Sequence, residues 1–126
     1  MMSGAYTEVV LDHFRNPRNV GVLEDPDAVG RAENPVSGAS IELFLRIRED
    51  RVFQATCQAQ GCTATIAASS VLTEMLVGRT VGEVGGILRT EIEGILGGLP
   101  PTRKHVADLA EDVARAAVED YRVRTG

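Results

Sequence analysis

The chain has 126 residues, and we expect residues 1–126 to form a single domain. Its 13 basic and 18 acidic side chains give a formal net charge of −5, so it lacks the basic surface of a nucleic-acid-binding protein. Two cysteines are too few for a disulfide framework or for a four-thiolate metal site within one chain. The sequence has no run of 18 apolar residues and no signal-peptide pattern, so we expect a cytoplasmic protein without a membrane partner.

The N-terminal segment has the pattern of one amphipathic helix. Ser3 is its expected N-cap, and Pro17 ends it. Residues that recur at three- and four-residue intervals predict one buried face: Tyr6, Val9, Val10, His13 and Phe14. Residues 15–27 are rich in Asn, Gly and Pro, which predicts a loop.

Three strands are expected next, over 29–36, 41–48 and 52–60, with a hairpin turn at 49–51. Apolar residues alternate with polar ones in the last two strands: Ile41, Leu43, Leu45 and Ile47, then Phe53, Ala55, Cys57 and Ala59. This period of two with one polar face predicts an antiparallel sheet.

After Gly61 the pattern becomes helical. Helices are expected over 62–77, 80–88, 90–96 and 102–122, and Thr80 with Glu83 has the spacing of a capping box. The last helix has one apolar face: Val106, Leu109, Ala110, Val113, Ala117 and Tyr121. The predicted class is α+β, a three-stranded antiparallel sheet packed on one side by helices, with an N-terminal helix and a long C-terminal helix.

Cys62 is the first candidate for chemistry, because it lies at the junction between a strand and a helix. A helix N-terminus stabilises a thiolate, which is both a nucleophile and a soft metal ligand. The alternative is a small buried side chain that begins a helix. Cys57 shares a strand face with apolar residues, so we expect a core thiol there.

His105 is the second candidate, near the start of the last helix. Its imidazole could bind a metal or act as a base, and a solvated histidine is the alternative. His13 is expected to be structural. The sequence shows no carboxylate pair, phosphate-binding loop or serine-nucleophile motif, so we do not expect an enzyme.

Several blocks, in order and with fitting spacing, resemble the IscU/NifU N-terminal iron–sulfur cluster scaffolds. The blocks are 12–21, Gly61-Cys62 with 66–70 and 73–74, and Leu99-Pro100-Pro101 with His105 and 109–112. The resemblance runs from Tyr6 to Tyr121. It implies an α+β fold and a role in iron–sulfur cluster assembly.

In that family, three cysteines from three loops, with an aspartate and a histidine, hold a nascent cluster or zinc. The resemblance places the second cysteine at Cys62 and the histidine at His105. The other three positions hold Ser37, Ala39 and Val106, so only a reduced ligand set remains. Two chains could together supply two cysteines and two histidines, which would make the site part of a homo-oligomer.

The resemblance also implies two partners. A cysteine desulfurase would deliver sulfur to Cys62 as a persulfide, and an Hsp70-type chaperone would bind the loop formed here by Leu99, Pro100, Pro101, Thr102 and Arg103. Three functions remain open. The chain could be a scaffold that holds iron, an iron–sulfur cluster or zinc. The other two are a partner-binding module without metal and a persulfide relay. We expect Cys62 and His105 to lie close together in space.

Overall fold

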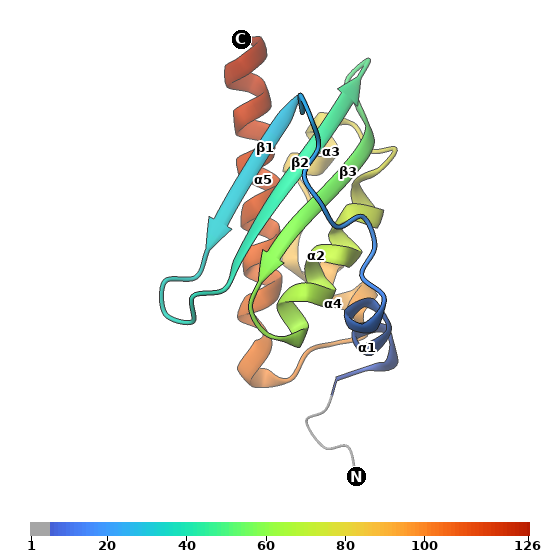
Figure 1. The fold of residues 1–126 in the computed structure, drawn as a ribbon, viewed down its shortest axis with the longest axis vertical. Helices are drawn as coiled ribbons and strands as arrows, with labels where there is room; N and C mark the ends of the chain where they lie inside the picture. The colour runs from blue at the N-terminus through green and yellow to red at the C-terminus, as the bar shows by residue number, and fades with distance from the viewer. Residues whose placement is uncertain (1–5) are drawn as a thin grey trace.

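The computed structural model describes residues 6–126, so the expected N-cap Ser3 lies outside the described residues. The elements, in chain order, are α1 (Glu8–Arg15), β1 (Ala28–Glu33), β2 (Ser40–Arg48), β3 (Arg51–Gln60), α2 (Thr63–Leu76), α3 (Val81–Gly85), α4 (Arg89–Leu96), the 3₁₀ helix η1 (Pro101–Arg103) and α5 (His105–Thr125). Figure 1 shows the sheet as one layer and the main helices as a second layer behind it. The expected α+β class, with an N-terminal helix and a long C-terminal helix, is confirmed.

The sheet has the order β1-β2-β3, and both pairs are antiparallel. Glu49 and Asp50 form the turn between β2 and β3 with φ of 52° and 64°, the left-handed conformation that a two-residue hairpin turn needs. Helix α5 packs on β1 and β2, and α2 packs on β3 (Figure 1). The core between these layers is aliphatic, as the scarcity of aromatic residues predicts.

The helix ends differ from the expected ones at two places. The final helix begins at His105 because Pro101–Arg103 form a separate 3₁₀ turn. The helix expected over 80–88 is shorter in the structure, where α3 spans Val81–Gly85. The predicted capping box between Thr80 and Glu83 is confirmed. No helix in the described part, Tyr6 to Gly126, is long and apolar enough to cross a membrane.

The two layers approach each other closely at Gly30 in β1. A side-chain carbon at this position would lie 2.4 Å from the backbone oxygen of Val113 and 2.6 Å from the backbone nitrogen of Ala117. Asp120 fixes the same contact, because its Oδ2 accepts a hydrogen bond of 2.8 Å from the backbone N–H of Val29. Helix α5 can therefore lie directly on β1 only while residue 30 has no side chain.

Gly30→Ala should lower the free energy of unfolding by about 3 kcal/mol, since the added methyl group meets backbone that cannot rotate away. Gly94→Ala is the matched control. Gly94 lies in α4, where a methyl group added to its Cα would meet nothing within 4 Å, and alanine there should stabilise the helix by about 0.5–1 kcal/mol. Urea unfolding of the two variants measures both effects. Equal stability of the two variants would contradict the close packing at Gly30.

Two aromatic residues of the sheet are not where alternation places them. A register shift at Arg46/Ile47 makes Phe53 an extra residue of β3, so its side chain is exposed and lies under the guanidinium of Arg48. Phe44, expected on the polar face, is buried. The segment 19–27 crosses that outer face of the sheet (Figure 1) and forms hydrogen bonds to β2 and β3.

The buried face of α1 is narrower than the sequence predicts. Thr7 caps this helix, and only Val10 and His13 are buried, whereas Val9 and Phe14 are exposed. The expectation that all five recurring residues form one buried face is therefore wrong. A helix of eight residues at the edge of the molecule covers α2 with little more than one row of side chains.

A buried polar network joins α1 to α2 at Ser70. The Ser70 Oγ accepts a hydrogen bond from the backbone N–H of Arg18 and lies 2.8 Å from Nδ1 of His13. The other ring nitrogen, Nε2, lies 3.6 Å from Oε1 of Glu74. Asn19 adds a bond from its side-chain amide to Thr73 Oγ1. Two of the sequence blocks that carry the family resemblance therefore bind each other.

This network predicts that the protein loses stability as the pH falls below about 6.5. Burial lowers the pKa of His13, and the charge of Arg18 lowers it further, against the opposing charges of Glu74 and Asp12. The folded chain therefore binds fewer protons at His13 than the unfolded chain does, so acid favours unfolding. One such proton gives a slope of at most about 1.4 kcal/mol per pH unit. Urea unfolding between pH 7.5 and 5.5 should show this slope, and His13→Gln should flatten it.

Candidate functional site

Cys62 lies where β3 turns into α2. Gly61 makes the turn with φ +147°, and a side-chain carbon there would lie 2.7 Å from Thr65 Oγ1 and 3.0 Å from Ala39 Cβ. Cys62 follows in an extended conformation as the N-cap of α2, and its side chain is half-buried. The predicted position of this thiol at a helix N-terminus is confirmed.

The surroundings of Cys62 favour its thiolate form. Burial raises the pKa of the thiol, but the hydroxyl and backbone amide of Thr65, the amide of Ala64 and the charge of Arg103 together outweigh it and lower the pKa. The Sγ lies 3.5 Å from Thr65 Oγ1, and the amides point toward the sulfur without forming a regular cap bond. A half-exposed thiol with these neighbours can act as a nucleophile or as a soft metal ligand.

Arg103 is the cation beside this thiol. The hydroxyl of Tyr6 and the charge of the Cys62 thiolate raise the pKa of its guanidinium. Its Nη1 donates to the backbone oxygen of Thr102 at 3.2 Å, and its Nε is shielded from solvent with no hydrogen-bond partner among residues 6–126. The sequence analysis assigned Arg103 only to a partner-binding loop and missed its effect on the pKa of Cys62. Nothing in the spacing of the two residues along the chain indicates that effect.

The loop 99–103 is only partly available to a partner. Leu99 is buried in the core, Pro100 and Arg103 are half-buried, and Pro101 and Thr102 are exposed. The most accessible part of the predicted partner-binding loop is therefore its tip, Pro101 and Thr102.

The remaining family positions gather at the same end of the molecule as Cys62. The β1–β2 loop, the β3–α2 turn and the start of α5 all lie there (Figure 1). Ser37 is exposed, and its Oγ accepts a hydrogen bond from the backbone N–H of Ala39. Ala39 and Val106 are buried in the core, and His105 is half-buried at the start of α5. Two of the three replaced ligand positions are thus filled by apolar groups.

The metal-binding prediction rests on Cys62 and His105 alone. Within residues 6–126, the structure places no group of three or more His, Cys, Asp or Glu side chains so that they could hold a metal ion. His105 is the first residue of α5, and the start of α5 lies at the same end of the fold as the β3–α2 turn that carries Cys62 (Figure 1). That they bind one metal together stays a prediction.

Cys57 is a core thiol, as expected. Its side chain is 2% exposed in β3, and burial raises its pKa. Its backbone N–H donates to Asn19 and its carbonyl accepts from Gly21, both at 2.9 Å. The two cysteines therefore differ sharply in accessibility and in ease of ionisation, which makes Cys57 a natural control for Cys62.

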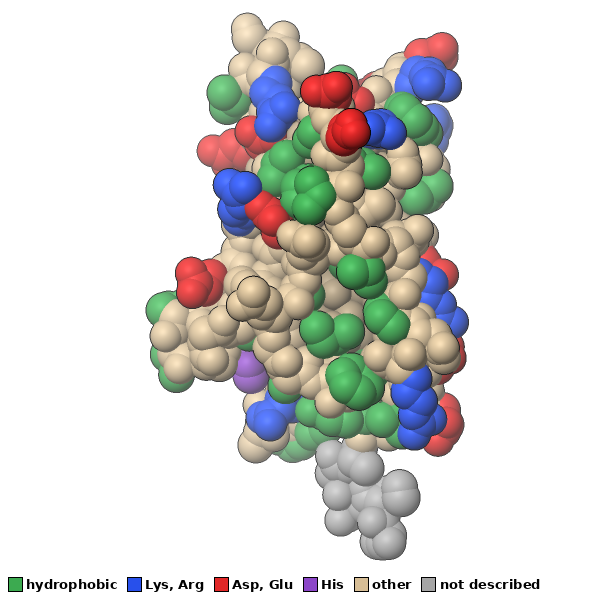
Figure 2. Space-filling view, viewed as in Figure 1, with side chains coloured by type: hydrophobic (Ala, Val, Ile, Leu, Met, Phe, Trp, Pro, Cys, Tyr) green, Lys and Arg blue, Asp and Glu red, His purple; other side chains and the backbone are tan. Residues whose placement is uncertain are grey.

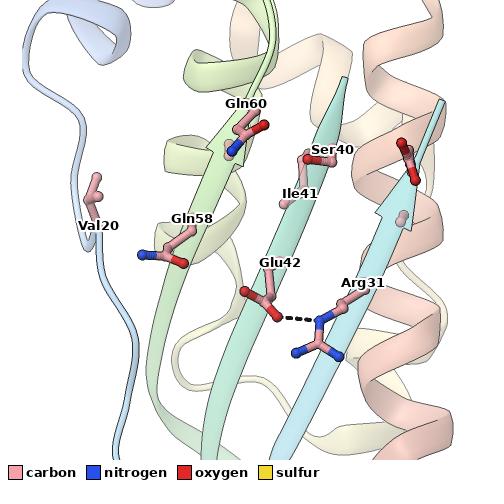
Figure 3. Close-up of a pocket in the computed structure, with 10 residues that line it drawn as sticks. Val20, Arg31, Ser40, Ile41, Glu42, Gln58 and Gln60 are labelled. Carbon is pink, nitrogen blue, oxygen red and sulfur yellow. Dashed lines mark hydrogen bonds and ion pairs between the residues drawn. The ribbon is translucent and has the colours of Figure 1, made fainter. Parts of the chain in front are cut away.

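A shallow hollow of about 690 Å³ lies on the outer face of the sheet. Figure 3 shows Gln58 and Gln60 on β3, Glu42 on β2 and Arg31 on β1, with an ion pair between Arg31 and Glu42. On this face, hydrophobic and charged side chains are interspersed in small groups (Figure 2). Neither candidate residue, Cys62 or His105, lines the hollow.

Comparisons with known proteins agree with the resemblance. The family described as NifU-like N terminal domain matches residues 5–126. The iron-sulfur cluster assembly scaffold protein IscU 1 of Archaeoglobus fulgidus is 42% identical over 121 residues, which cover 96% of this chain and 79% of that protein. The iron-sulfur cluster assembly scaffold protein IscU of Azotobacter vinelandii is 40% identical over 126 residues, which cover 97% of this chain and 98% of that protein. A crystal structure of a NifU-like protein (N-terminal) from Brucella abortus shares the fold, with a TM-score of 0.79, 18% identity and 94% coverage of each chain.

Proposed function

This chain belongs to the family of NifU-like N-terminal domains, and from that premise we propose that it serves iron–sulfur cluster assembly as a scaffold-type protein with a reduced ligand set. Cys62 is the proposed sulfur acceptor and, with His105, the proposed metal-ligand pair. One observation carries the proposal: a half-buried thiol of lowered pKa is the N-cap of α2.

The sulfur-accepting step needs one thiolate. Cys62 attacks the terminal sulfur of a cysteine persulfide on the donor, which the resemblance suggests is a cysteine desulfurase. A sulfur–sulfur bond forms at Cys62, the sulfur–sulfur bond of the donor breaks, and the donor cysteine leaves as a thiolate. The proton stays with the transferred sulfur. Because one sulfur–sulfur bond replaces another, the step needs no oxidant or reductant. Arg103 offsets the negative charge at the acceptor.

Holding iron, a cluster or zinc needs more than this chain supplies. A thiolate and an imidazole suit both iron and zinc, and histidine replaces thiolates in some iron–sulfur centres. Two ligands leave about half of a four-coordinate site open. Ser37, Ala39 and Val106 offer no thiolate or carboxylate, so the cargo would be completed by a second copy of the chain or by a partner.

A second candidate function is a persulfide relay, in which Cys62 accepts sulfur and passes it on without holding metal. The burial of Ala39 and Val106 favours it, because these apolar groups stand where the family places ligands. A module that only binds partners is the third reading, and it would not depend on Cys62.

Anaerobic reconstitution with iron and sulfide tests the scaffold proposal. Metal and labile sulfide per chain should approach stoichiometric amounts in the wild type, fall to background in Cys62→Ser and remain in Cys57→Ala. His105→Ala should also lose its metal if two cysteines and two histidines from two chains form one site. Background metal in the wild type would refute the holding of cargo by this chain and leave the relay or the partner-binding module.

A further inference from the structure

The two edges of the sheet differ in how far the rest of the chain covers them. Along β3, Cys57 exchanges two hydrogen bonds of 2.9 Å with the segment 19–21, and Val52 exchanges two with the segment 78–79, of 2.8 and 2.9 Å. The opposite edge is β1 (Figure 1), and no strand within residues 6–126 pairs with its outer side. An edge strand of this kind offers its unpaired N–H and C=O groups to another strand.

The register of β1 shows which of its backbone groups point outward. The N–H of Asn34 donates to the oxygen of Ala39 at 2.8 Å and continues the β1–β2 ladder, so the even-numbered residues of β1 bond to β2. The N–H of Val29 points away from β2, to a carboxylate of α5. Because neighbouring residues of a strand alternate in direction, the N–H and C=O groups of Arg31 and Glu33 also point outward.

Helix α5 covers only the first part of this edge. The Oδ2 of Asp120 accepts hydrogen bonds of 2.8 Å from the backbone N–H of Val29 and from Nε of Arg124. The Nη1 of Arg124 donates to the backbone oxygen of Pro26 at 3.1 Å. The open part of the edge is therefore the short stretch 31–33.

The charges on this open stretch are complementary to a second copy of themselves. Arg31 and Glu33 are both exposed and lie two positions apart, so they share the outer face of the sheet. In an antiparallel pair of two copies with Ala32 on the two-fold axis, Arg31 of each copy lies directly opposite Glu33 of the other. Opposite charges in such a pair stabilise a sheet. A register centred on Arg31 or on Glu33 would place like charges opposite each other.

We propose that β1 is a self-pairing edge, through which two copies of this chain join antiparallel along residues 31–33 into one continuous sheet. The assembly closes at two copies, because the β3 edge is already bonded to other segments of the chain. The β1–β2 loop lies at the Cys62 end of the fold, so antiparallel pairing directs the Cys62 ends of the two copies in opposite directions. This dimer is therefore distinct from a two-chain metal site and does not depend on the proposed function.

Sedimentation of the chain between about 10 µM and 1 mM tests the proposal, since so short an interface predicts a weak dimer. The average mass should rise with concentration from 13.5 kDa toward twice that value. Arg31→Glu and Glu33→Arg should each weaken self-association at least about tenfold, because each change makes both cross-strand pairs like-charged. An equimolar mixture of the two variants should associate again, because every pair then joins opposite charges.

Two further substitutions are matched controls. Arg122→Glu at the end of α5 and Glu8→Arg at the start of α1 change the net charge by the same amounts at exposed positions away from the β1 edge. Both should associate as the wild type does. Thermal unfolding shows that each variant is folded.

Amide hydrogen exchange locates the contact within β1. The amides of Arg31 and Glu33 should exchange more slowly at high concentration than at low concentration. The amides of Gly30 and Ala32, which face β2, should exchange at rates that do not depend on concentration.

Three results would overturn the inference. A chain that stays monomeric up to about 1 mM does not pair with itself, and the open edge is then left for a strand of another protein. Association that survives either charge change at the edge, or that the mixture of variants does not restore, takes place on another surface. The proposed function fails on separate measurements, the metal content and the sulfur transfer at Cys62, so the two failures can be told apart.

Discussion

Incubation of the chain with a cysteine desulfurase and cysteine should add about 32 Da, the mass of one sulfur atom, to Cys62. The thiol is half-exposed, begins a helix, and has a lowered pKa through Thr65, Ala64 and Arg103. A persulfide on the donor can therefore reach an acceptor that is already biased toward its thiolate. Intact-mass spectrometry of the protein before and after incubation measures the gain.

The two cysteines provide the control within one chain. Cys57 is 2% exposed and burial raises its pKa, so it should gain no sulfur. Cys62→Ser should abolish the mass gain, whereas Cys57→Ala should keep it. A gain that persists in Cys62→Ser, or that maps to the peptide containing Cys57, would show that the fold does not direct sulfur to the start of α2.

The helices and strands of this fold can be predicted from local sequence patterns. The wrong predictions concern side chains whose burial depends on strand pairing or on contacts with distant segments. Alternation over 41–48 and 52–60 predicts β2 and β3 closely, and the capping box at Thr80 marks the start of α3. The exposure of Phe53 depends on a bulge that the residue pattern does not mark. Phe44 is buried although alternation places it on the outer face, which the segment 19–27 crosses through hydrogen bonds to β2 and β3.

The position of the candidate thiol could be predicted from the sequence, but its surroundings could not. A cysteine after Gly61, at the change from period two to a helical period, indicates a thiol at a helix start, and the structure places Cys62 there. The effect of Arg103 on the pKa of Cys62 was not predictable, because the two residues lie in different segments and act on each other only through the tertiary fold. The resemblance marked Ala39 and Val106 as replaced ligands, and their burial adds that the replacements are apolar groups within the core.

Returning the family residues with Ser37→Cys, Ala39→Asp and Val106→Cys should give a chain that binds zinc. All three positions lie at the end of the fold that contains Cys62, and three thiolates with a carboxylate or imidazole satisfy a tetrahedral zinc ion. Without metal, the variant should be less stable than the wild type, since the change at Val106 removes packing worth about 1 kcal/mol and the change at Ala39 buries a carboxylate. At a zinc concentration of about 100 times Kd, binding should raise the thermal midpoint by about 10 °C.

The decisive control is the same triple variant with Cys62→Ser, which removes the one thiol that the wild type retains in the site. Zinc should then shift the thermal midpoint less than in the triple variant, because a thiolate ligand is lost while two thiolates, the carboxylate and the imidazole of His105 remain. If the shift is the same with and without Cys62, Cys62 is not part of the ligand set. If the triple variant shows no shift although it is folded, the side chains at 37, 39 and 106 do not converge on Cys62. The loss of metal binding would then be built into the backbone of this chain as well as into its ligands.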